Sequence, residues 1–211
     1  MPSAGKTKRQ LPDWLLRAGD TGFSRLASWP FWRNMIIYFC AVSVIGHLLE
    51  YPYCWLGMTL FDSVDPNSEV LSNPFKPFFV YGVGIVLCAI CLEPLRKSLL
   101  EHCRNPYTAL IVFYIISVFI GMAFELTQGF LQNQPVNGVY PLWDVHDHPG
   151  NILGQAWIVN DIFIGLLITL IVWVVLPMLN AFMNRIPDRT ANICCVVIVA
   201  ATIALTVLTY R

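Results

Sequence analysis

Five long apolar stretches constrain this sequence more than any other feature. Each is long enough to cross the hydrocarbon core of a bilayer, about 30 Å thick, as a helix of about 20 residues. We expect them near 34–56, 78–95, 107–131, 157–181 and 191–209. Charged residues make up 12% of the chain, against about 25% in soluble domains, which excludes an ordinary soluble fold. The sequence therefore predicts an all-α, polytopic membrane protein with about five transmembrane helices.

Positive charges are distributed unevenly between the predicted loops. Of the 13 Lys and Arg residues, all but Lys76 and Arg211 fall on the same side of the membrane as the N-terminus. Arg96 follows directly after the second stretch and is counted with a loop on that side. The positive-inside rule places the basic side in the cytoplasm. We therefore expect a cytoplasmic N-terminus and an outer C-terminus. The formal net charge of zero does not indicate a nucleic-acid partner.

Two regions are predicted along the chain. Residues 1–33 form a basic cytoplasmic segment, and residues 34–211 form a single transmembrane helical domain. Within the first region, aromatic residues mix with Arg17 and Arg25 over 11–29, which is typical of a helix that lies in the cytoplasmic interface of the membrane.

A short glycine-lysine motif near the start resembles part of a nucleotide-binding loop. Gly5-Lys6-Thr7 matches the end of the phosphate-binding pattern, but only four residues precede Gly5. The strand and the first glycine that the pattern requires have no place there. We therefore expect no ATPase in this chain.

Three carboxylic residues lie inside the predicted spans. Glu50 and Glu125 come about six residues before the outer ends of the first and third stretches, and Asp161 about five after the start of the fourth. At 1.5 Å per helical residue, all three lie roughly 7 to 9 Å below the outer boundary. Each alone has a structural explanation, as a helix cap or an interhelical hydrogen bond. Ionisable residues at one level of three spans favour a shared functional pocket.

Polar side chains extend two of these helix faces. His47 and Tyr51 lie on the helical face of Glu50, and Gln128 lies one turn from Glu125. Glycines near the carboxylates, Gly121 and Gly82 among them, would let neighbouring helices approach closely.

The segment 132–156 between the third and fourth stretches is polar and contains no Lys or Arg. His146, Asp147 and His148 offer nitrogen and oxygen ligands for a divalent metal ion. The other interpretations of this segment are an exposed polar loop and a packed lid over the pocket, with turns at Trp143. No other cofactor is predicted.

Four short motifs resemble a known family. They are Gly46-His47-Leu48-Leu49-Glu50-Tyr51, Tyr81-Gly82, Phe124-Glu125-Leu126-Thr127-Gln128-Gly129, and the spaced set Trp143, Asp144, Pro149, Asn151 and Gly154. Over roughly 34–181 the chain resembles the bacterial membrane proteins described as putative ABC-transporter permeases, the type IV or CmpB-like family. The resemblance implies a multi-pass protein of a bacterial inner or plasma membrane that works with a separate ATPase subunit.

The resemblance also has departures. This chain has His146 and His148 where relatives are expected to have Ser and Lys, and Gln155 where they often have Arg. The motif positions that carry over are Glu50, Glu125, Trp143, Asp144, Asn151 and Gly154. Loss of the Arg would make the site of this chain more negative than that of its relatives.

The leading hypothesis is a transport protein, a permease subunit with an acidic outer-leaflet cavity for a cationic or protonatable solute. The candidate binding residues are His47, Glu50, Tyr51, Tyr81, Glu125, Gln128, Trp143, Asp144, Asn151 and Asp161. One alternative is an intramembrane enzyme acting on a lipid or lipid-linked substrate, with paired carboxyl groups as acid and base. The other is an accessory scaffold of a membrane complex. Membrane lipid, a separate ATPase subunit and a second copy of the chain are the expected partners.

Overall fold

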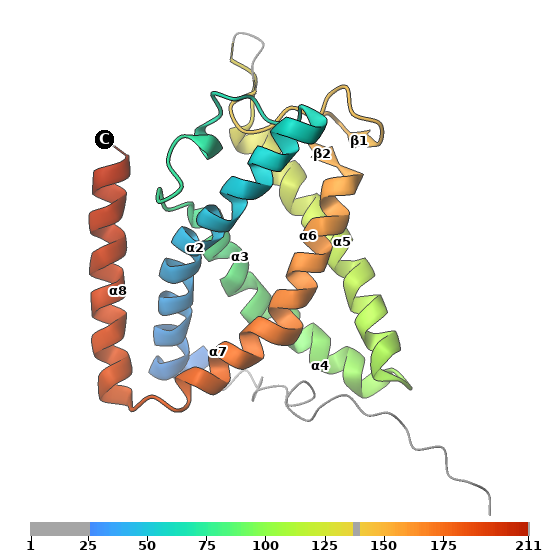
Figure 1. Ribbon diagram of the computed structural model, residues 1–211. Helices are drawn as coiled ribbons and strands as arrows, with labels where there is room; N and C mark the ends of the chain where they lie inside the picture. The colour runs from blue at the N-terminus through green and yellow to red at the C-terminus, as the bar shows by residue number, and fades with distance from the viewer. Residues whose placement is uncertain (1–25, 137–139, 211) are drawn as a thin grey trace, which may run out of the picture.

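The computed structural model describes residues 26–136 and 140–210 (Figure 1). In these residues five helices are long and apolar enough to cross a membrane. They are Trp29–Phe61, Phe79–His102, Pro106–Gln132, Ile158–Met183 and Asp188–Thr209. This confirms the predicted all-α fold with five membrane-spanning candidates. The interfacial helix predicted over 11–29 lies almost entirely outside the described residues.

Three of the spans are single α-helices, and two are interrupted. The uninterrupted ones are α2 (Trp29–Phe61), α5 (Pro106–Gln132) and α8 (Asp188–Thr209). The second span consists of α3 (Phe79–Leu87), the π-helical turn η3 (Cys88–Leu92) and α4 (Glu93–His102). The fourth consists of α6 (Ile158–Leu170), the π-helical turn η4 (Ile171–Val175) and α7 (Leu176–Met183). The short elements are the 3₁₀ turn η2 (Glu69–Leu71) and the hairpin β1 (Asn151–Ile152) with β2 (Ala156–Trp157).

Prolines explain the two π-helical turns. Pro94 and Pro177 each lie two residues beyond a π-helical turn. A proline cannot donate to the carbonyl four residues earlier, and its ring clashes with that carbonyl in a regular helix. A wider turn accommodates the ring. Because the helix continues, the second span does not stop near residue 95 as expected but runs through Arg96 to His102.

The connections gather at the two ends of the bundle. One end, called the loop end below, carries the α2–α3 loop (62–78), the α5–α6 segment (133–157) and the last turn of α8 (Figure 1). At the opposite end lie the start of α2, the α4–α5 turn and the α7–α8 turn. The described loop end is rich in aspartate, and Lys76 is a cation within it. Which end faces the cytoplasm stays a prediction from the positive-inside rule.

The apolar core lies in the half of the bundle away from the loop end. Phe113 of α5 and Val172 and Leu176 of the fourth span are completely buried there. A smaller cluster around Cys54, Val64 and Val70 packs beneath the loops at the loop end. The loops are therefore attached to the helices by their own apolar contacts.

Two glycines let α5 and α6 cross closely. A Cβ atom on Gly165 would lie 2.5 Å from Cγ2 of Val118 and 2.8 Å from its backbone nitrogen, and one on Gly121 would lie 2.6 Å from Cγ2 of Ile164. Gly121 is four residues before Glu125, and Gly165 four after Asp161, so each glycine shares a helix face with a carboxylic residue. The close crossing thus sets the separation of the two carboxyl groups.

We expect Gly165→Ala to lower the free energy of unfolding by about 1 to 3 kcal/mol, because the new methyl group must displace the backbone of α5. Thermal unfolding of the purified protein in detergent measures the change. Gly84→Ala is the matched control, since nothing lies within 4 Å of a Cβ atom on this helical glycine. The control should be unchanged or more stable by up to about 1 kcal/mol. Equal stability of the two variants would contradict a tight crossing.

Candidate functional site

A pair of carboxyl groups lies between α5 and α6. Glu125 and Asp161 are within hydrogen-bonding reach of each other, and their side chains are buried, with residue exposures of 6% and 0%. Neither oxygen of Asp161 receives a hydrogen bond from a described donor. Two carboxyl groups can share such a contact when a proton or another cation lies between them. The structure therefore brings together two of the three predicted carboxylates.

Neutral donors surround the Glu125 carboxylate. The side-chain amide of Asn160 donates to Oε1, and the backbone N–H of Trp157 donates to Oε2 over 3.4 Å. Asn160 in turn accepts a hydrogen bond from the Tyr53 hydroxyl. None of these three neighbours carries a positive charge. A hydrogen-bonded chain thus runs from Tyr53 on α2 through Asn160 on α6 to Glu125 on α5.

The third carboxylate, Glu50, lies beside this pair but has its own partners. The Tyr81 hydroxyl and the Cys54 thiol are its polar neighbours, and Oε2 of Glu50 is buried without a hydrogen-bond partner among the described residues. Tyr53 is close enough to interact electrostatically with both Glu50 and Glu125. The three predicted carboxylates are therefore arranged as a Glu125–Asp161 pair with Glu50 as a neighbour, and Tyr53 lies near both.

An open groove lies at the loop end. It has a volume of about 560 Å³ and is lined by Leu60, Phe61, Asp62, Asp144, Asp147, His148, Pro149 and Trp157. Asp144 is the predicted binding residue that reaches this groove, whereas Glu50, Glu125 and Asp161 are not part of its lining. Trp157 connects the two places, because it lines the groove while its backbone N–H contacts Glu125.

The spaced loop motif contributes Asp144 and Pro149 to the lining of the groove, while Trp143 and Asn151 lie outside the lining. The Trp143 indole donates to the carbonyl of Gln155 over 2.9 Å, and Asn133 donates to the Trp143 carbonyl over 2.7 Å. The Asn151 amide donates to the carbonyls of His146 and His148. We therefore interpret Trp143 and Asn151, predicted as binding residues, as the scaffold that orients Asp144.

The candidate metal ligands have separate partners. His146 Nδ1 is hydrogen-bonded to the Tyr140 hydroxyl at 3.1 Å, and His148 Nε2 donates to the carbonyl of Phe61 at 2.8 Å. Asp147 lines the groove beside His148. Among the described residues, no three His, Cys, Asp or Glu side chains are grouped closely enough to hold a metal ion.

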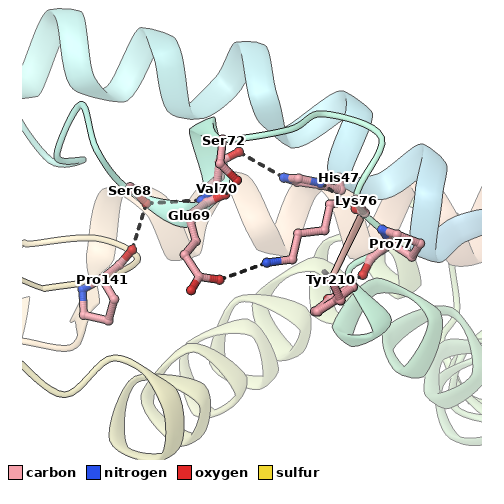
Figure 2. Close-up of polar contacts among 9 residues, drawn as sticks. All are labelled: His47, Ser68, Glu69, Val70, Ser72, Lys76, Pro77, Pro141 and Tyr210. Carbon is pink, nitrogen blue, oxygen red and sulfur yellow. Dashed lines mark hydrogen bonds and ion pairs between the residues drawn. The ribbon is translucent and has the colours of Figure 1, made fainter. Parts of the chain in front are cut away.

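Three further predicted residues lie outside the pair. His47 is completely buried and hydrogen-bonded to the backbone of the α2–α3 loop (Figure 2). Tyr51 on α2 and Gln128 on α5 are half-buried. In the described part of the chain the hydrogen bonds of Glu125 go to Trp157 and Asn160 and not to Tyr51 or Gln128, although Gln128 lies one turn from Glu125.

Sequence analysis missed Asn160, Tyr53 and Trp157. Asn160 is a polar residue inside an apolar span and directly precedes Asp161, which is a usable signal. Tyr53 lies three residues after Glu50 on the same helix face. Trp157 contributes a backbone N–H, which sequence alone does not reveal.

A second buried polar cluster lies near the two π-helical turns. Glu93 and Arg96 of α4 are 2% and 0% exposed, although Arg96 had been counted with a loop. Arg96 donates to the carbonyl of Trp173 at 3.5 Å, and its guanidinium lies 5.7 Å from the centre of the Trp173 ring. Pro177 lacks the N–H that would otherwise bond to this carbonyl, so Arg96 takes the place of that donor.

Comparison with known proteins supports the sequence resemblance. A family model described as "Putative ABC-transporter type IV" matches residues 37–210, which include the carboxyl pair, the groove and both π-helical turns. Neither the curated proteins nor the solved structures gave a match. Because the family match spans most of the chain, this membrane protein belongs to the putative ABC-transporter type IV family.

Proposed function

We propose that this chain is the membrane-embedded transport subunit of a solute transporter, and that it binds a cationic or protonatable solute at the Glu125–Asp161 pair. The observation that carries the proposal is the buried contact of these two carboxyl groups beside neutral neighbours. A buried carboxylate needs a counter-charge or a proton. In the proposal, one proton lies between the two groups until the solute replaces it.

The groove supports this function as the entrance. Asp62, Asp144 and Asp147 surround it with negative charge, and Phe61 and Trp157 add aromatic surface. Aspartates attract cations from solution, and aromatic faces bind organic cations. Trp157 borders both the groove and Glu125, so a solute that displaces its indole would pass from the groove to the pair.

The Tyr53–Asn160–Glu125 chain would report occupancy to α2. When a cation binds the carboxylates, the amide of Asn160 is free to reorient, and its bond to Tyr53 changes with it. Coupling to energy would then come from the separate ATPase subunit docked at the basic end, or from the displaced proton. A second copy of the chain would complete the pathway, because transporters commonly pair two similar halves.

Cation binding tests the proposal directly. We expect at least one of sodium, guanidinium or tetramethylammonium chloride to raise the unfolding temperature of the purified protein. A ligand at a hundred times its dissociation constant stabilises a protein by about 2.7 kcal/mol. Glu125→Gln should abolish this stabilisation, whereas Glu101→Gln, an exposed change at the opposite end, should retain it. Stabilisation that is equal in Glu125→Gln, or absent with all three salts, would rule out the site.

Proton release provides the second test. With a cation that stabilises the wild type, we expect about one proton to be released per cation bound, because the pair cannot hold both. The Asp161→Asn variant should fold and bind the cation with almost no proton release, because the introduced amide donates permanently to Glu125. A pH indicator in weakly buffered solution measures the count. The same proton count in Asp161→Asn would contradict a proton shared by the pair.

A further inference from the structure

His47 makes two hydrogen bonds to the backbone of the α2–α3 loop. Its Nδ1 lies 2.7 Å from the carbonyl oxygen of Lys76, and its Nε2 lies 3.0 Å from the carbonyl oxygen of Val70 (Figure 2). The ring is completely buried and stacks on Phe78, with the ring centres 3.8 Å apart and the planes 5° from parallel. The imidazole is therefore held in one orientation between two fixed acceptors.

A backbone carbonyl oxygen accepts hydrogen bonds and has no proton to donate. Hydrogen bonds to two carbonyl oxygens at once require a proton on each ring nitrogen, and an imidazole ring carries both protons only in the imidazolium form. In the neutral ring one nitrogen presents a lone pair instead, which repels the lone pairs of the carbonyl it faces. One of the two bonds of His47 is then lost, and a buried carbonyl is left without its donor.

The two carbonyls belong to a stretch of loop that is tied at several further points. Lys76 forms an ion pair with Glu69 at 3.1 Å and lies 4.4 Å from the centre of the Tyr210 ring. The Tyr210 hydroxyl donates to the carbonyl of Pro77 at 2.8 Å (Figure 2). These contacts lie at the surface or at the end of α8, whereas His47 holds the same stretch from inside the bundle.

The α2–α3 loop also supports the wall of the groove. Ser68 donates to the carbonyls of Pro141 and Leu142, and the Asp144 backbone N–H donates to the carbonyl of Ser63 at 2.9 Å. Movement of residues 62–78 would therefore move the segment that carries Asp144. The His47 contacts and the shape of the groove are mechanically connected.

We propose that His47 is a proton-dependent latch: the doubly protonated ring holds the α2–α3 loop closed through the carbonyls of Val70 and Lys76, and loss of one proton releases it. A rise in pH then loosens the loop and, through Ser63 and Ser68, the wall of the groove. The latch goes beyond the proposed solute site, because it uses none of the carboxyl groups of that site.

Other titratable groups lie on every element around the ring. They are Glu50 and Tyr51 on α2, Glu69 and Lys76 in the loop, Tyr81 on α3 and Tyr210 at the end of α8. Glu69 is bonded to Lys76, and Tyr81 is a polar neighbour of Glu50.

Hydrogen–deuterium exchange of residues 62–78 between pH 5 and pH 8 tests the latch in the full-length protein in detergent. After correction for the chemical exchange rate, we expect the protection factor of this peptide to fall by about tenfold from pH 5 to pH 8. A fall of this size is within what the loss of one proton linked to opening of the loop can produce. His47→Gln should show low protection that no longer depends on pH. His102→Gln is the matched control, because His102 is exposed at the opposite end and also bonds a backbone carbonyl; it should behave as the wild type does.

Protection that is constant with pH in the wild type, or a pH dependence that persists in His47→Gln, would overturn the latch. If His47→Gln does not fold, nitrogen-15 NMR of the wild-type imidazole groups decides instead. His47 is then assigned by elimination with His102→Gln, His146→Gln and His148→Gln. Two protonated ring nitrogens at pH 5 and one at pH 8 support the latch, and a neutral ring throughout contradicts it. Unchanged loop exchange in Glu125→Gln separates this device from the solute site.

Discussion

The close crossing of α5 and α6 is the constraint on which the rest of the site depends. Because Gly121 and Gly165 leave no side chain at the crossing, Glu125 and Asp161 meet one turn away in an apolar bundle. Carboxyl groups in such surroundings are costly unless their oxygens find donors or a counter-charge. Asn160 and the Trp157 backbone supply donors on one side, and Asp161 is left facing Glu125. The chemistry of the site follows from this geometry.

Sequence patterns were sufficient for the helices but not for their exact lengths. Apolar stretches of about 20 residues predicted all five spans, because backbone groups in lipid must be satisfied within the helix. The end of the second span was wrong because Arg96, a charged residue, looked like the start of a loop. Only the fold shows that Trp173 and Pro177 supply a buried place for its guanidinium.

The level of the carboxylates was also predictable, whereas their pairing was not. Distance from the span ends placed Glu50, Glu125 and Asp161 at one depth, but helix rotation decides which of them touch. The loop shows a similar limit. Trp143 and Asn151 stay predicted binding residues, and their hydrogen bonds to Gln155 and to the two histidine carbonyls could not be read from the sequence. A spaced motif indicates that its residues act together. Only their contacts in the fold can distinguish residues that bind a solute from residues that support the loop.

The bond between Arg96 and the Trp173 carbonyl has a consequence for how the protein assembles during synthesis. The guanidinium leaves the ribosome about 77 residues before its acceptor does. Until the fourth span arrives, a charged helix would face lipid with part of its hydrogen-bonding capacity unfulfilled, a costly arrangement. The bond therefore joins the second span to the fourth, so the two segments stabilise each other in the bilayer.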